Sequence, residues 1–213
     1  MKRMQKGFTL VEIAIVLVII GLLLGGILKG QEMITQAKIK NVIADFSGVS
    51  AAYHGYQDRY RATPGDDPNA ATRWAGAVAG DGDGQLAGAY NSALGTDESR
   101  KWWDHLRRSG FITGTGDQQP LNAANGMVGV QNGNAAGGAA LGGLPGLVIC
   151  SANLPDKIAI ATDTQMDDGS SNTGTVRAST PQTTSNPPID AAATAAPNYA
   201  ETGTNLYTVC RTL

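Results

Sequence analysis

The sequence predicts an α+β protein: a long N-terminal α-helix packed on a small antiparallel β-sheet head, with loop-rich insertions and one disulfide. Three observations lead to this fold class. An apolar run extends from Phe8 to Leu28, apolar residues recur at helical spacing from there to about Tyr60, and short β-rich runs follow Leu144. Glycine is abundant, at 28 of 213 residues, and only 16% of residues are charged, which indicates a head with many loops.

The net charge and the cysteine content limit the classes of function. A formal net charge of −2 provides no bulk basic field, so no nucleic-acid partner is predicted. Two cysteines, Cys150 and Cys210, lie in the C-terminal third, and in an exported chain their simplest use is one disulfide. Closing a loop of that length contributes about 4 kcal/mol in the chain-entropy account.

The N-terminal apolar run has the length of a membrane span. As a helix, residues 8–28 extend about 31 Å, which is enough to cross a bilayer. Lys2, Arg3 and Lys6 precede the run, so the positive-inside rule places the N-terminus in the cytoplasm and the rest of the chain outside. No small-x-small cleavage site follows Leu28, so we expect the span to stay attached.

Glu12 interrupts this run, although a carboxylate in hydrocarbon costs about 2.5–3.5 kcal/mol on insertion scales. The stretch KGFTLVE around it resembles the processing site of type IV prepilins and of the pseudopilins of type II secretion. The resemblance implies that a prepilin peptidase cuts between Gly7 and Phe8 and N-methylates Phe8. It also implies that Glu12 of one subunit pairs with the Phe8 amine of a neighbour and sets the axial register. The alternative is that Glu12 only snorkels toward the headgroups.

The same resemblance implies a division of the chain and a set of partners. It implies a leader peptide over 1–7, a transmembrane and filament-core helix over 8–28, an amphipathic continuation over 29–60 and a globular head over 61–213. The implied function is a structural subunit, major or minor, of a type IV pilus-like filament. Its partners would be other pilins in a homo- or hetero-polymer, the prepilin peptidase and an inner-membrane assembly platform. We expect the chain to lie in the inner membrane before assembly and in a cell-surface pilus or a periplasmic pseudopilus afterwards.

Two other functions stay open at this point. One is a pseudopilin of type II secretion with a calcium-stabilised head. The other is a monomeric, membrane-anchored binding domain, in which the helix is only a tether.

The helix is predicted to continue past the span as an amphipathic segment. Pro64 and Gly65 end it by about Tyr60. The apolar stripe at helical spacing consists of Ile34, Ile39, Val42, Ile43, Phe46, Val49 and Tyr53.

A second helix is predicted over TDESRKWWDHLRRSG. Thr96 is the expected N-cap, and Gly110 suits the C-terminal stop. Trp102, Trp103 and Leu106 form its apolar side and are expected to pack into the core of the head.

Strands are predicted from Leu144 onward. The runs GLVIC and DKIAIATD, Val176 with its neighbours, and LYTVC are short and rich in β-formers. The Pro/Thr/Ala-rich stretch 179–198 is expected to be exposed and irregular, and the sequence leaves its glycosylation open.

An acidic loop, DTQMDDGSSNTG, is a possible calcium site. Major pseudopilins bind calcium in an acidic loop of the C-terminal region, and Asp163, Asp167, Asp168 and Ser170 offer oxygens in that manner. The alternative is an Asp-Asp-Gly turn. No cofactor is otherwise predicted.

An earlier loop, GDGDG, alternates Asp81 and Asp83 with glycine and ends near Gln85. It has neither the glycine at position six nor the glutamate at position twelve of an EF-hand, so a tight Asp-Gly turn competes with calcium binding there.

The sequence contains no set of residues typical of an enzyme. The two histidines, His54 and His105, both fall in predicted helices, and Asp58 one turn after His54 is better explained as a solvated pair than as a metal site. There is no GxSxG, HExxH or P-loop motif. We therefore predict that the chain is not an enzyme.

Overall fold

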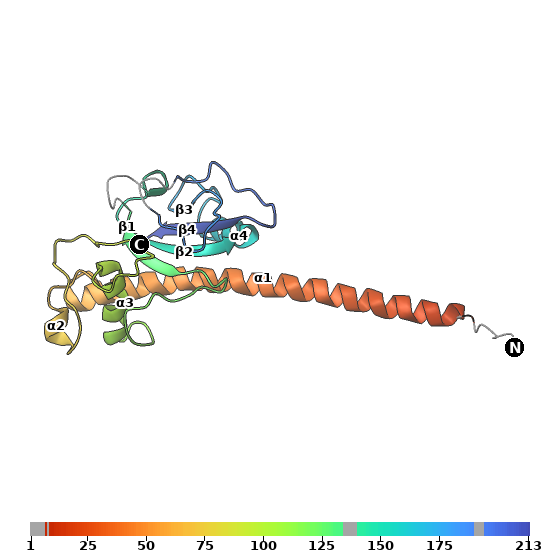
Figure 1. The fold of residues 1–213 in the computed structure, drawn as a ribbon, viewed down its shortest axis with the longest axis horizontal. Helices are drawn as coiled ribbons and strands as arrows, with labels where there is room; N and C mark the ends of the chain where they lie inside the picture. The colour runs from red at the N-terminus through yellow and green to blue at the C-terminus, as the bar shows by residue number, and fades with distance from the viewer. Residues whose placement is uncertain (1–6, 8, 134–139, 190–193) are drawn as a thin grey trace. The chain divides into compact units, whose positions relative to one another are not determined.

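Helix α1, Leu10–Tyr60, is the longest element of the chain (Figure 1). The computed structural model describes residues 7, 9–133, 140–189 and 194–213. Contacts within the chain divide it into two units, Met1–Ala37 and Lys38–Leu213. The second unit contains the C-terminal part of α1 and every other described helix and strand.

The part of α1 in the first unit contains a long apolar stretch, followed by polar residues from Lys29 onward. Within the described residues, α1 is the one helix long and apolar enough to cross a membrane, and none of its most apolar 18-residue window is buried. The long N-terminal helix is thus confirmed. It begins at Leu10; the predicted start, Phe8, lies outside the described residues.

In the second unit, α1 presents one apolar stripe to the core of the head. The predicted stripe was right at Ile39, Val42, Phe46 and Val49, which are buried, and at Ile43 and Tyr53, which are partly buried against the core. It was wrong at Ile34, which lies in the first unit and is 59% exposed. Two further buried positions, at the same three-to-four-residue spacing, were missed: Ala52 and Tyr56. The helix ends where predicted, because Arg61 adopts a left-handed backbone conformation with φ of 54°.

Helix α3, Glu98–Arg108, packs against this part of α1. Trp102, Trp103 and Leu106 are fully buried as predicted, and the Trp102 ring stacks on Tyr53 of α1 at 5.3 Å between ring centroids. The predicted Thr96 cap was wrong. Asp97 is the N-cap residue, and its carboxylate makes no capping bond because it accepts the hydroxyl of Ser92 instead, at 2.5 Å.

The head contains one four-stranded antiparallel sheet, in the spatial order β1-β2-β4-β3. Its strands are β1 Val128–Asn132, β2 Leu147–Pro155, β3 Val176–Ala178 and β4 Leu206–Thr212. Figure 1 shows the sheet lying along the C-terminal part of α1, and apolar side chains of β1, β2 and β4 share a core with that part of the helix. Short helical turns occur at α2, Ala70–Arg73, and at a 3₁₀ segment, Ala140–Gly142.

The sequence prediction was wrong for DKIAIATD, which forms helix α4, Asp156–Met166, and not a strand. Its alternation of Ile and Ala imitates a strand of period two. The buried positions Ile158, Ala159, Thr162 and Asp163 instead follow the one-three-one spacing of a helix face. Strand β1 was missed because VGVQN is short and contains a glycine.

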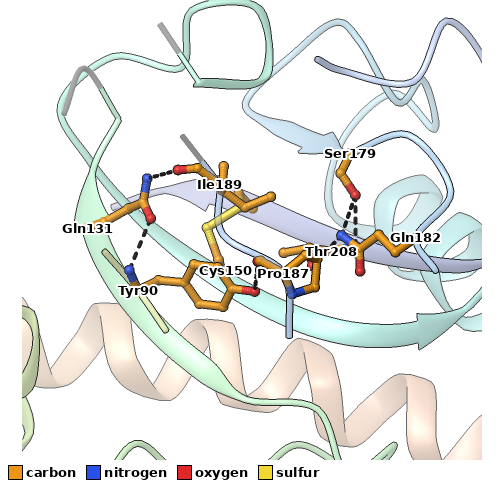
Figure 2. The surroundings of a disulfide bond; sticks show 9 residues. Tyr90, Gln131, Cys150, Ser179, Gln182, Pro187, Ile189 and Thr208 are labelled. Atoms are coloured by element: carbon orange, nitrogen blue, oxygen red, sulfur yellow. Dashed lines mark hydrogen bonds between the residues drawn. A yellow bond between two sulfur atoms is a disulfide. The ribbon is translucent and has the colours of Figure 1, made fainter. Parts of the chain in front are cut away.

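The predicted disulfide joins Cys150 of β2 to Cys210 of β4, which are directly opposed in the sheet. Both residues are fully buried in a small second core. Figure 2 shows polar side chains holding loops around it: Gln131 accepts the N–H of Tyr90 at 3.0 Å and donates to the carbonyl of Ile189 at 2.6 Å. The Tyr90 hydroxyl donates to the carbonyl of Pro187 at 2.6 Å.

The double substitution Cys150→Ala with Cys210→Ala should lower the free energy of unfolding of the head by about 2–5 kcal/mol, because it releases a constraint across 60 residues of chain. Urea denaturation of the detergent-solubilised chain, followed by tryptophan fluorescence, measures this loss. Wild type with its disulfide reduced is the control and should fall by a similar amount. Equal unfolding midpoints for the oxidised wild type and the variant would show that the bond does not stabilise the head.

Candidate functional site

The N-terminal end of α1 is closed by a reciprocal pair of hydrogen bonds between Thr9 and Glu12. The Glu12 carboxylate accepts the backbone N–H and the hydroxyl of Thr9, both at 2.8 Å, and the Glu12 N–H donates to the Thr9 hydroxyl oxygen at 3.3 Å. Thr9 immediately precedes the helix and Glu12 is its third residue, so the pair is a capping box. Sequence reasoning missed it, although Thr-x-x-Glu before an apolar run is its recognised signature.

This geometry gives Glu12 a partner within its own chain. In a chain cut after Gly7, the new α-amino group would belong to residue 8. Residue 8 directly precedes Thr9, whose backbone N–H already donates a hydrogen bond to Glu12. Phe8 itself lies outside the described residues. Cleavage, methylation and the Glu12–Phe8 pair therefore stay predictions. The Glu12 carboxylate is oriented toward the N-terminal end of the helix, which is where the predicted charge pair requires it.

The acidic loop after α4 brings three of its four predicted ligands together. Carboxylate oxygens of Asp163, Asp167 and Asp168 lie within 4.8 Å of one another. Ser170 is held by its backbone, whose N–H donates to Asp168 at 2.8 Å, while its hydroxyl donates to Asn172 at 3.0 Å. The geometry is that of a tight acidic turn, which includes Gly169 at a φ of 76°.

Protein donors already bind each of these carboxylates. Asp163 accepts the hydroxyl of Tyr199 at 2.6 Å and the N–H of Gly169 at 3.0 Å. Asp167 accepts the N–H of Val176 at 2.9 Å, and Asp168 is bound by Thr173 at 2.5 Å. A cation would share oxygens with these donors, so calcium binding there stays a prediction.

The ionised form of Asp163 is disfavoured at this turn because the side chain is withdrawn from solvent. Burial raises the pKa of Asp163 to about 6; the hydrogen bonds from Tyr199 and Gly169 oppose that rise, and the nearby negative charges of Asp168 and Asp167 add to it. The hydrogen bond from Thr173 lowers the pKa of Asp168.

A second acidic group organises the GDGDG loop. Asp66 accepts the N–H groups of Gly82 at 2.6 Å and Gly84 at 3.0 Å. Glu98 accepts the N–H of Asp81 at 3.1 Å and that of Ala87 at 3.0 Å. Both acceptors are buried, and burial raises the pKa of each.

Sequence reasoning assigned the loop to Asp81, Asp83 and Gln85 and missed Asp66 and Glu98. Within the loop, Asp83 donates its N–H to Asp81 at 3.1 Å and Gln85 donates its N–H to Asp83 at 2.7 Å, which are the contacts of tight Asx turns. The missed acceptors are 11 to 18 residues from the N–H groups that they bind, and no short sequence pattern records such pairs.

His105 is a buried structural link between α3 and the segments before and after α2. Its Nδ1 accepts the N–H of Gly65 at 2.9 Å, and its Nε2 lies 2.9 Å from the carbonyl oxygen of Val78. These partners require a proton on Nε2 and none on Nδ1. With both ring nitrogens engaged, His105 has no nitrogen available for proton transfer, whereas His54 is exposed on α1.

The loop before α2 is held to α1 by Asp67. This carboxylate is fully buried, accepts the hydroxyl of Tyr56 at 2.6 Å, and forms an ion pair with Arg73. Removing one partner of a buried pair leaves the other uncompensated, so this contact serves the fold of the loop.

Comparison with known proteins assigns the N-terminal segment. Residues 2–28 match the family model described as the prokaryotic N-terminal methylation motif, the signature of type IV pilins and pseudopilins. No curated protein and no solved structure matches the chain. The motif supports a type IV pilin-like or pseudopilin subunit, a class that is structural and not enzymatic.

The contribution of His105 to the free energy of unfolding of the head should fall as the pH drops below about 6.5. Burial lowers the pKa of His105 in the folded chain. The stabilisation by its neutral form is complete above the pKa of the unfolded chain and declines below it, by at most about 1.4 kcal/mol per pH unit.

Urea denaturation of wild type and His105→Gln between pH 7.5 and 5.5 tests this contribution. The amide of glutamine can both accept and donate but does not titrate, so the variant should lose less stability than wild type over this range. His54→Gln is the matched control and should follow wild type. Parallel curves for wild type and His105→Gln would contradict the assignment.

Proposed function

We propose that the chain is a structural subunit of a type IV pilus-like filament, processed by a prepilin peptidase after Gly7 and polymerised through its N-terminal helix. The observation that carries the proposal is the N-terminal methylation motif over residues 2–28. It coincides with a helix whose most apolar window is wholly uncovered in the isolated chain. An uncovered apolar helix needs either lipid or other helices around it.

Polymerisation supplies such a cover. Before assembly, the apolar part of α1 spans the inner membrane with Lys2, Arg3 and Lys6 on the cytoplasmic side. During assembly, the helices leave the lipid for a bundle with one another. The disulfide of the head supports an exported location, because such bonds persist in oxidising compartments.

Glu12 sets the register in this proposal. The carboxylate of one subunit pairs with the Phe8 amine of a neighbour, and each charge offsets the desolvation cost of the other. The capping box supports this role, because it holds the carboxylate at the end of the helix where the amine forms. It also offers a competing explanation, in which Glu12 only caps its own helix.

A pseudopilin of type II secretion is the second candidate function. The observation that favours it is the group of Asp163, Asp167 and Asp168 oxygens within 4.8 Å of one another. In this alternative, calcium relieves the repulsion at the turn and stabilises the head. A monomeric tethered binding domain is the third candidate, and an unprocessed N-terminus on a protein that stays in the membrane fraction would favour it.

Glu12→Ala should leave cleavage after Gly7 largely intact and reduce incorporation into filaments at least tenfold. Mass spectrometry of residue 8 in membrane and sheared-filament fractions measures both. Thr9→Ala is the matched control. It removes the hydroxyl of the capping box, a loss of about 1 kcal/mol, but leaves the carboxylate, so its filaments should still form.

The pair of variants separates the two explanations of Glu12. Equal assembly defects in Thr9→Ala and Glu12→Ala would mean that Glu12 acts as a helix cap. Normal assembly of Glu12→Ala would refute the charge pair.

The pseudopilin alternative predicts that calcium raises the unfolding midpoint of the detergent-solubilised chain. At 100 times the dissociation constant, the ion would add about 2.7 kcal/mol to the free energy of unfolding. Asp168→Asn should abolish this gain, because Asp168 is an exposed member of the group. Asp58→Asn, on the exposed face of α1, is the control and should keep it. An unchanged midpoint in millimolar calcium would count against a calcium-stabilised head.

A further inference from the structure

A groove with apolar walls lies in the head between the C-terminal part of α1 and the segment after α3. Its volume is about 340 Å³. Its lining includes Val49 of α1, Trp103 of α3, and Phe111, Pro120 and Leu121 of the segment after α3. Leu121 is 62% exposed, so an apolar side chain stands at the edge of an apolar hollow.

Asp45 of α1 also lines this groove, and it is half-buried. Within the described part of the chain, its carboxylate has no hydrogen bond and no ion pair. The buried carboxylates of the head differ, since Asp67, Glu98, Asp156 and Asp163 each accept hydrogen bonds from protein donors. A partly desolvated carboxylate beside apolar walls is costly without a partner, so the groove favours a ligand that carries a cation.

Helix α1 itself carries a lysine that is suited to pair with Asp45 of another molecule. Lys40 is exposed and has no ion pair among the residues that the structure describes. Five residues separate it from Asp45, which corresponds to about 140° around the helix and about 7.5 Å along it. The two side chains therefore lie on different flanks of α1, and they cannot meet within one chain.

Two complementary patches on different flanks make a head-to-tail contact. When it repeats, such a contact forms a ring if its rotation closes and an open helical array if it does not, whereas a symmetric dimer would require one self-complementary patch. The methylene stem of a lysine can lie along an apolar wall while its ammonium group reaches a carboxylate at the rim.

We propose that this groove is the docking site for a second copy of the chain, whose Lys40 pairs with Asp45. The inference rests on the proposed function, because it supplies a contact between heads for the filament that the N-terminal helix builds. The occupant is a neighbouring head, and the complementary charges at Asp45 and Lys40 select it.

Photo-crosslinking in assembled filaments tests the site. The full chain carries p-benzoylphenylalanine in place of Leu121, and the filaments are irradiated before they are sheared. We expect crosslinked dimers whose adduct maps by mass spectrometry to residues around Lys40 of the second copy. The matched control places the same probe at Leu94, which is 64% exposed but does not line the groove, and it should give no adduct in that region.

A charge exchange tests the pairing. Asp45→Lys and Lys40→Asp should each reduce the yield of filaments at least tenfold, and the double variant should recover most of that yield. Tryptophan fluorescence of the detergent-solubilised variants shows whether each head is folded. If folded single variants assemble normally, or if the double variant is no better than the single ones, the pairing is overturned.

The outcomes separate this inference from the proposed function. Filaments that contain methylated Phe8 but give no Leu121 adduct near Lys40 overturn the docking site alone. Adducts with a different protein do the same, because they assign the groove to another occupant. A chain that forms no filaments at all overturns the proposed function and the docking site with it.

Discussion

Helix α1 carries more apolar surface than its own chain covers, and this excess constrains where the protein can exist. Along its C-terminal part the head covers one stripe, and residues such as Phe46 and Tyr56 are almost completely buried there. Along the apolar window none of the surface is buried. At about 25 cal/mol per Å² of apolar area, leaving such a surface in water is unfavourable by far more than a single contact can offset. The chain must therefore exist in lipid or in contact with other chains.

In the head, buried carboxylates accept many of the backbone N–H groups that helices and sheets would bind in most domains. Glycine-rich loops leave many backbone N–H groups without a ladder partner, and buried polar groups must be satisfied. Asp66, Glu98, Asp156 and Asp163 each accept N–H groups from loop residues. A few acidic side chains consequently hold the loops in place, although the loops contain little helix or strand.

Much of the architecture follows from local patterns, and the failures have identifiable physical causes. The two halves of α1, the tryptophans of α3 and the Cys150–Cys210 bond were predictable because periodicity, aromatic content and cysteine number report them directly. Helix α4 was not predictable, because a short alternation of Ile and Ala fits both the period of a strand and the period of a helix. Packing against the core of the head selects the helix. The capping of Glu12 by Thr9 was readable but was overlooked in favour of a charge pair between chains. Asp66 and the groove beside Asp45 depend on residues that are distant in sequence, so no local pattern could have indicated them.

The order of strands in the sheet has a consequence for biogenesis. Strand β4 lies between β2 and β3 in space but follows both along the chain, and among the described strands β3 pairs with β4 alone. As the chain is synthesised, β1 and β2 can form a hairpin early, whereas the pairing of β3 with β4 waits for residues 206–212. The oxidation of Cys150 must wait for the same segment. A chain stalled before that point would present a strand edge without β4 and a free thiol, and these are features that chaperones and thiol oxidoreductases can recognise.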